Sequence, residues 1–79
     1  MATVTLLVTK ECHLCGAARE ALDRVTEKSG TRWEEIDVLD HPDLAREYGD
    51  RLPVVLLDDK EHSYWDVDEE RLIRDLAQR

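Results

Sequence analysis

The sequence contains no apolar run long enough to cross a membrane, and its N-terminus has no basic stretch followed by an apolar signal core. A membrane-spanning helix needs about 20 consecutive apolar residues, so that class of protein is excluded for this sequence. We therefore expect a cytoplasmic protein without a membrane partner.

An excess of positive charge is also missing. Lys and Arg number 11 against 19 Asp and Glu, which gives a formal net charge of −8. Because nucleic acids and anionic membranes are negatively charged, electrostatic repulsion opposes their binding to such a protein. We expect no nucleic-acid partner, although acidity serves solubility equally well.

Linkers, repeats and low-complexity segments are absent, and 79 residues leave room for only one core. A chain of this size buries about 60% of the surface that its unfolded form exposes. We expect residues 1–79 to form a single domain, and we expect that domain to be a monomer.

The pattern of apolar residues predicts four strands and three helices. Thr3–Thr9 is rich in β-branched residues and nearly continuously apolar, as in a central strand covered on both faces. The apolar spacing then becomes that of one helical face, until Gly30 ends the helix. This face is made of Leu14, Ala17, Ala18, Ala21, Leu22 and Val25. The other strands are expected at Thr31–Val38, Pro53–Asp58 and His62–Val67, and the other helices at Asp40–Gly49 and from Asp68 onward.

Some single residues also receive structural predictions. Asp40 is expected to cap the second helix, and Trp33 and Trp65 are expected to be packing residues on strands. His41 and His62 are predicted to be ordinary surface residues.

The element order β-α-β-α-β-β-α predicts an α/β fold. A strand, a helix and a second strand form a parallel pair, and the last two strands form a hairpin. We therefore expect a four-stranded mixed sheet with helices on both faces.

The only two cysteines, Cys12 and Cys15, stand three positions apart where the first strand leads into the first helix. Unpaired N–H groups at a helix N-terminus stabilise an anion, which lowers a thiol pKa from about 8.5 toward neutrality. One turn later, Cys15 could attack a mixed disulfide formed by Cys12. The spacing and the position favour thiol–disulfide exchange, with Cys15 the more protected thiol.

Three other uses of the cysteine pair compete with thiol–disulfide exchange. A structural disulfide would close a very small loop and stabilise the fold by only about 2 kcal/mol, and cytoplasm would reduce it. A zinc site needs two more ligands, but His41 and His62 do not have the short spacing of paired histidine ligands. Inert buried cysteines are the third alternative. For these reasons we expect no metal at the pair.

The segments CHLC (Cys12–Cys15), YGDRLPVVLLD and WDVDEERLIRDL resemble those of the glutaredoxin-like proteins, small members of the thioredoxin-fold superfamily. The resemblance covers essentially the whole chain and implies a thioredoxin-like fold. It also implies that Cys12 attacks and Cys15 resolves. By the same resemblance Pro53 is a cis-proline facing the cysteines, and the backbone of Leu52 pairs with the substrate backbone.

The chain departs from glutathione-using glutaredoxins at two places. Asp58-Asp59-Lys60 replaces a Gly-Gly pair after the proline strand. Four carboxylates crowd the start of the last helix, where such proteins bind the glutamyl carboxylate of glutathione: Asp66, Asp68, Glu69 and Glu70. Each exposed charge opposes an incoming carboxylate by a fraction of a kcal/mol, so we expect glutathione to be a poor reductant.

Two residues near the pair could tune its reactivity. His13, when protonated, would hold Cys12 as a thiolate, or it could simply face solvent. Lys10 could add positive charge, which Glu11 partly cancels.

The function expected from the sequence is that of a glutaredoxin-like dithiol–disulfide oxidoreductase. It has no built-in cofactor and acts on a protein disulfide, and a reductase or a low-molecular-weight thiol recycles it. The alternative is a non-enzymatic module that binds a metal or an iron–sulfur cluster through the cysteine pair. A redox-silent interaction domain is the third class.

Overall fold

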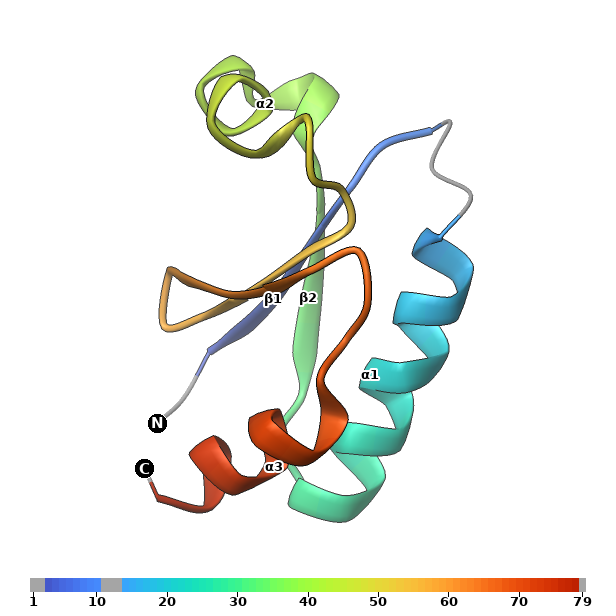
Figure 1. Cartoon of the computed structure of the whole chain (residues 1–79), viewed down its shortest axis with the longest axis vertical. Coiled ribbons are helices and arrows are strands. Elements are labelled where there is room, and N and C mark those ends of the chain that lie inside the picture. The colour runs from blue at the N-terminus through green and yellow to red at the C-terminus, as the bar shows by residue number, and fades with distance from the viewer. Residues whose placement is uncertain (1–2, 11–13, 79) are drawn as a thin grey trace.

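The computed structural model describes residues 3–10 and 14–78 (Figure 1). Four strands lie at Val4–Val8 (β1), Trp33–Asp37 (β2), Val54–Leu57 (β3) and Lys60–Tyr64 (β4). Three α-helices lie at Cys15–Ser29 (α1), Pro42–Tyr48 (α2) and Glu69–Ala77 (α3), and Val38–Asp40 forms a short 3-10 helix. The predicted order of elements and the α/β class are confirmed.

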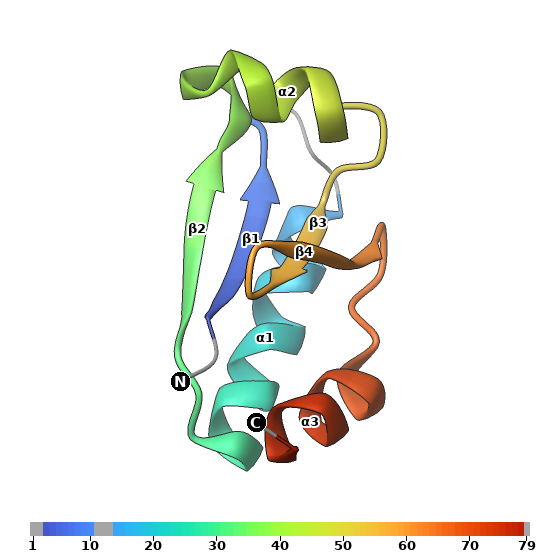
Figure 2. The same ribbon diagram turned by 90° about the vertical axis from the view of Figure 1, so that its left-hand side faces the viewer.

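The four strands form one mixed sheet in the order β2-β1-β3-β4 (Figure 2). Strand β1 runs parallel to β2 and antiparallel to β3, and β3 pairs with β4 as an antiparallel hairpin. Val4 lies opposite Trp33 on one side of β1, and Leu7 lies opposite Val54 on the other. The predicted parallel pair and closing hairpin are therefore both present.

All five residues of β1 are buried, because helices cover both faces of the sheet. Val4, Leu6 and Val8 pack into a cluster with α1 and α3. Leu7 belongs to a second cluster on the opposite face, which residues of α2 cover. The segment Thr3–Thr9 is nearly continuously apolar because both faces of β1 are covered, as the sequence predicted.

Helix α1 buries a stripe that differs slightly from the predicted one. Ala18, Ala21, Leu22 and Val25 are buried as expected, and Cys15 joins them. Leu14 is 45% exposed because it precedes the helix as its N-cap residue. Ala17 is also exposed, so its predicted burial was wrong. At the other end, Gly30 adopts φ 75° and its N–H donates to Thr26 O, as a C-terminal glycine should.

The β3–β4 hairpin shifts the fourth strand toward the N-terminus. Asp58 and Asp59 both have positive φ and form a two-residue turn, so β4 begins at Lys60 and ends at Tyr64. Trp65 therefore lies beyond the strand with φ 65° and 53% exposure, and its predicted packing role was wrong. Trp33 does lie on β2, where it packs against the core and its indole donates to Asp23.

The predicted cap of the second helix was also wrong. The carboxylate of Asp37 accepts the N–H of Leu39 at 2.9 Å and starts the 3-10 turn directly after β2. This turn includes Asp40, so α2 begins only at Pro42 with His41 as its N-cap residue.

His62 is not a surface residue, because α3 packs over β4. Its side chain is 6% exposed, and its Nε2 lies 2.8 Å from Oδ2 of Asp75 on α3. Arg71 of the same helix donates to the backbone carbonyl of His62. These contacts hold α3 against β4, the strand at the edge of the sheet.

We predict that Asp75→Asn lowers the free energy of unfolding near neutral pH. The hydrogen bond to His62 comes first among the causes that hold the pKa of Asp75 below its usual range. A depressed carboxyl pKa stabilises the fold above the unfolded value, near pH 4, and this stabilisation is lost as pH falls through the folded value. Urea titrations at several pH values should show the difference from the unmodified protein shrinking below about pH 4.

Glu27→Gln, an exposed substitution on α1, is the control and should be nearly neutral at every pH. An equal loss of stability from Asp75→Asn at pH 7 and pH 3 would contradict the assigned hydrogen bond between Asp75 and His62.

Candidate functional site

Cys15 is the first residue of α1 and is 1% exposed. It packs in the same core cluster as Ala18 and Leu22, and its sulfur is disulfide-bonded. The N–H of Ala18 donates to Leu14 O at 3.1 Å, so Cys15 belongs to the first turn, where backbone N–H groups favour negative charge. Cys15 is thus buried, but the prediction that it is more protected than Cys12 stays a prediction. Cys12 and His13 lie outside the described residues.

The Leu52–Pro53 peptide bond is cis, as predicted. Pro53 is buried directly before β3, and its carbonyl accepts the N–H of Trp65 at 2.8 Å. The backbone N–H and C=O of Leu52, by contrast, make no hydrogen bond within the part of the chain that the structure describes.

The sheet brings the peptide of Leu52 to the same end of the molecule as the start of α1. Strand β3 runs antiparallel to β1, so its first residue, Val54, lies opposite Leu7 near the end of β1. Helix α1 follows that end of β1 in the chain. Both views show the start of α1 and the segment before β3 close together (Figures 1 and 2).

Arg51 holds the segment that leads into Leu52, a role that the sequence analysis missed. Its Nη2 donates to Glu47 O at 3.2 Å and to Glu61 Oε1 at 3.1 Å. Its guanidinium also lies 5.6 Å from the ring centre of Tyr48. Desolvation lowers the pKa of Arg51, but the hydrogen bond to Glu61 and nearby carboxylates raise it overall, so the side chain stays cationic.

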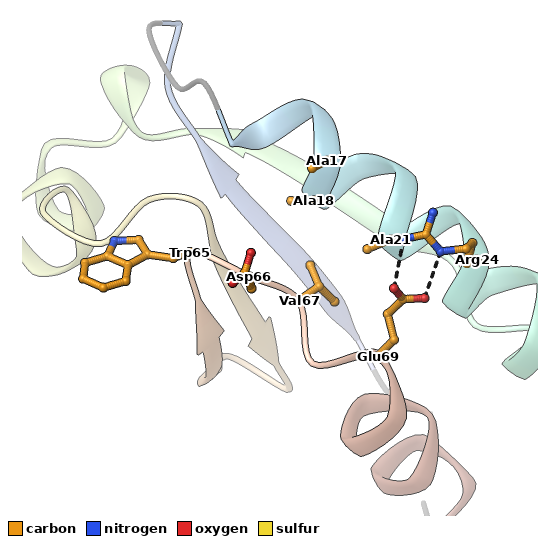
Figure 3. Close-up of a pocket in the computed structure, with 8 residues that line it drawn as sticks. All are labelled: Ala17, Ala18, Ala21, Arg24, Trp65, Asp66, Val67 and Glu69. Carbon is orange, nitrogen blue, oxygen red and sulfur yellow. Dashed lines mark hydrogen bonds and ion pairs between the residues drawn. The ribbon is translucent and has the colours of Figure 1, made fainter.

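A groove of about 240 Å³ lies between α1 and the segment that joins β4 to α3 (Figure 3). Helix α1 contributes Ala17, Ala18, Ala21 and Arg24, and the other wall contributes Trp65, Asp66, Val67 and Glu69. Sequence reasoning treated Ala17 as core and Trp65 as a strand residue, so it did not find this groove. The excess of alanine on the predicted helical face was the available signal.

Some of the carboxylates at the start of α3 make hydrogen bonds within the fold, which the sequence did not suggest. Glu69 pairs with Arg24 in two hydrogen bonds, of 3.1 and 2.9 Å, which lower the pKa of Glu69. Asp68 accepts the N–H of Arg71 and so caps the helix. Asp66 and Glu70 remain exposed. Two of the four expected repelling carboxylates are therefore engaged inside the fold.

Lys10 follows β1 and is exposed, at the sheet end where α1 begins. Within the described ranges 3–10 and 14–78, no group of three or more His, Cys, Asp or Glu side chains could hold a metal ion. In the same ranges, every helix is too short or too polar to span a bilayer.

Comparison with known proteins identifies the family and the fold. Residues 3–77 match the family described as glutaredoxin-like domain (DUF836). An uncharacterised protein of Mycobacterium tuberculosis is 46% identical over 79 residues, which cover 94% of this chain and 81% of that protein.

Solved structures agree with this. A protein of Nitrosomonas europaea superposes with a TM-score of 0.80 at 27% identity, covering 90% of this chain and 86% of that one. A mutant thioredoxin from Halobacterium salinarum superposes with a TM-score of 0.68 at 21% identity, covering 98% of this chain and 73% of that one. The chain has the thioredoxin fold, and it belongs to the glutaredoxin-like domain family.

Proposed function

We propose that the protein is a thiol–disulfide oxidoreductase in which Cys12 attacks and Cys15 resolves. The Cys12 thiolate attacks one sulfur of a substrate disulfide, forms a mixed disulfide and releases the other sulfur as a thiolate. Cys15, once deprotonated, then attacks the Cys12 sulfur and releases the second substrate thiol. The substrate gains two electrons, and the protein is left with a Cys12–Cys15 disulfide.

The observation that carries this proposal is the position of Cys15 in a thioredoxin-fold domain. It lies in the first turn of α1, is almost completely buried, and is separated from Cys12 by only two residues. A buried resolving thiol is shielded from competing disulfides but can still reach a sulfur attached to its neighbour. The helix end at Cys15 favours a thiolate, and we propose that it also favours one at Cys12.

The unpaired backbone edge of Leu52 supports a polypeptide substrate. An extended segment could pair its own N–H and C=O groups with this edge, as an added strand does. Pro53 lies next to this edge, and Arg51 holds the chain before it through contacts to Glu47 and Glu61. We propose Leu52 and Pro53 as substrate-binding residues.

Recycling and tuning complete the proposal. No resident cofactor is needed, because a reductase or a low-molecular-weight thiol would reduce the Cys12–Cys15 disulfide. His13 and Lys10 are proposed to favour the thiolate of Cys12 by their positive charge. The protein is proposed to act in the cytoplasm as a monomer.

The division of labour between the cysteines can be tested with two variants. We predict that Cys12→Ser abolishes disulfide reduction, whereas Cys15→Ser accumulates a mixed disulfide, because the resolving step is lost. Mass spectrometry after incubation with a peptide disulfide distinguishes the two. An adduct trapped on Cys15 in the Cys12→Ser variant, with unimpaired turnover, would reverse the roles. Iron–sulfur absorbance in the purified protein, without disulfide reduction, would instead favour the cluster-binding alternative.

Arg51→Gln tests whether the segment before Pro53 must be held in place. Without these contacts the segment before Pro53 is held less firmly, which should weaken the binding of a peptide disulfide by about 1 kcal/mol. We expect KM to rise roughly fivefold. The rate of Cys12 alkylation should not change, because the helix end that activates the thiol is untouched. Arg46→Gln, an exposed change on α2, is the matched control. Unchanged KM in the Arg51 variant would mean that this anchor does not serve substrate binding.

A further inference from the structure

The groove between α1 and the segment before α3 is joined to both parts of the proposed redox site. Its floor includes Ala18, which packs in the same cluster as Cys15, one turn away. Its opposite wall begins at Trp65, whose N–H is bonded to the carbonyl of Pro53. A chain bound at the Leu52 edge could therefore continue into this groove.

The shape of the groove suits an extended polypeptide segment. Helix α1 lines the groove with exposed Ala17 and with the largely buried Ala18 and Ala21, so no bulky side chain from this wall hinders a bound backbone there. Trp65 is 53% exposed and leads the opposite wall, ahead of Asp66 and Val67 (Figure 3). Its indole points away from the alanines of α1 in this view, so it offers apolar contact area beside the groove rather than within it.

The charged residues that line the groove favour a positively charged occupant. Arg24 is neutralised by two hydrogen bonds to Glu69 at the far end, as Figure 3 shows. Asp66 lies nearer the Pro53 end, and its carboxylate makes no hydrogen bond or ion pair within the described chain. The lining thus carries one uncompensated negative charge and no free cation among its eight residues.

An anionic occupant would meet two further obstacles. The N–H of Arg71 at the start of α3 already donates to Asp68, so this backbone donor is not open to an incoming carboxylate. Glu20 also lies close enough to contribute to the electrostatic field at Arg24. A cationic side chain would instead find an unpaired acceptor at Asp66.

We propose that this groove binds the segment flanking the disulfide of a protein substrate, and that it selects a segment with Lys or Arg near the reacting cysteine. The inference rests on the proposed thiol–disulfide exchange and names its substrate class. Asp66 is the specificity-determining residue, and Ala17 with Trp65 shapes the path of the chain.

Peptides that differ only in charge provide the test. Each carries one cysteine linked by a disulfide to 2-thio-5-nitrobenzoate, with Lys, Gln or Glu both two residues before and two residues after it. This design makes the result independent of chain direction. The corresponding mixed disulfide of 2-mercaptoethanol has the same leaving group and no peptide. The rate of 2-thio-5-nitrobenzoate release by the reduced full chain is measured with each.

We expect kcat/KM to fall in the order Lys, Gln, Glu, with Lys about tenfold above Glu at low salt and a smaller ratio at high salt. Asp66→Asn should reduce the ratio to about threefold. Asp59→Asn is the control, because it makes the same exchange in the exposed hairpin turn outside the groove, and it should leave the ratio unchanged.

A second variant tests the groove itself. Ala17→Leu adds bulk at an exposed position of α1, so the fold should tolerate it. It should slow the peptides severalfold while the 2-mercaptoethanol disulfide reacts at an unchanged rate. Equal rates for Lys and Glu peptides, with normal reaction of the small disulfide, would overturn the groove proposal alone. Failure to react with any of the disulfides would overturn the proposed function, and this inference with it.

Discussion

The burial of β1 on both faces and both edges is the constraint on which the rest of the structure depends. Its five residues are shielded by helices above and below and by β2 and β3 at its sides. Any shift in this strand would expose Leu6 or Leu7. Because β1 is fixed, the start of α1 and the start of β3 are fixed at the same end of the sheet. The proposed chemistry needs both of them there.

Three short segments, distant in sequence, meet at that end and contribute different physical properties. The first turn of α1 provides a field that favours thiolates and buries Cys15. The peptide of Leu52 provides backbone groups that make no hydrogen bond within residues 3–10 and 14–78. The segment from Trp65 to Glu69 closes a groove whose net charge is negative, because Arg24 is already paired. In the proposed function, reactivity, backbone pairing and charge selection would come from separate elements of one sheet-based fold.

Two errors of sequence-based prediction come from local turns that leave no hydrophobic pattern, and a third comes from a contact between elements distant in sequence. Trp65 was expected on a strand spanning His62–Val67, but the two-residue turn at Asp58–Asp59 makes β4 begin at Lys60, and the strand ends at Tyr64. His62 looked exposed because nothing local indicated that α3 would cover it. Asp40 looked like a cap because the 3-10 turn begun by Asp37 leaves no hydrophobic pattern.

The sequence by itself determined the order of elements, the central strand, the main helical face and the C-terminal glycine of α1, because periodicity and turn residues act over a few positions. Its resemblance to a known family also pointed to the cis bond before Pro53. Only the tertiary structure decided that Arg24 neutralises Glu69 and that the segment after β4 is tied to Pro53. Such pairings join distant positions, and they depend on how helices and strands pack rather than on any local preference.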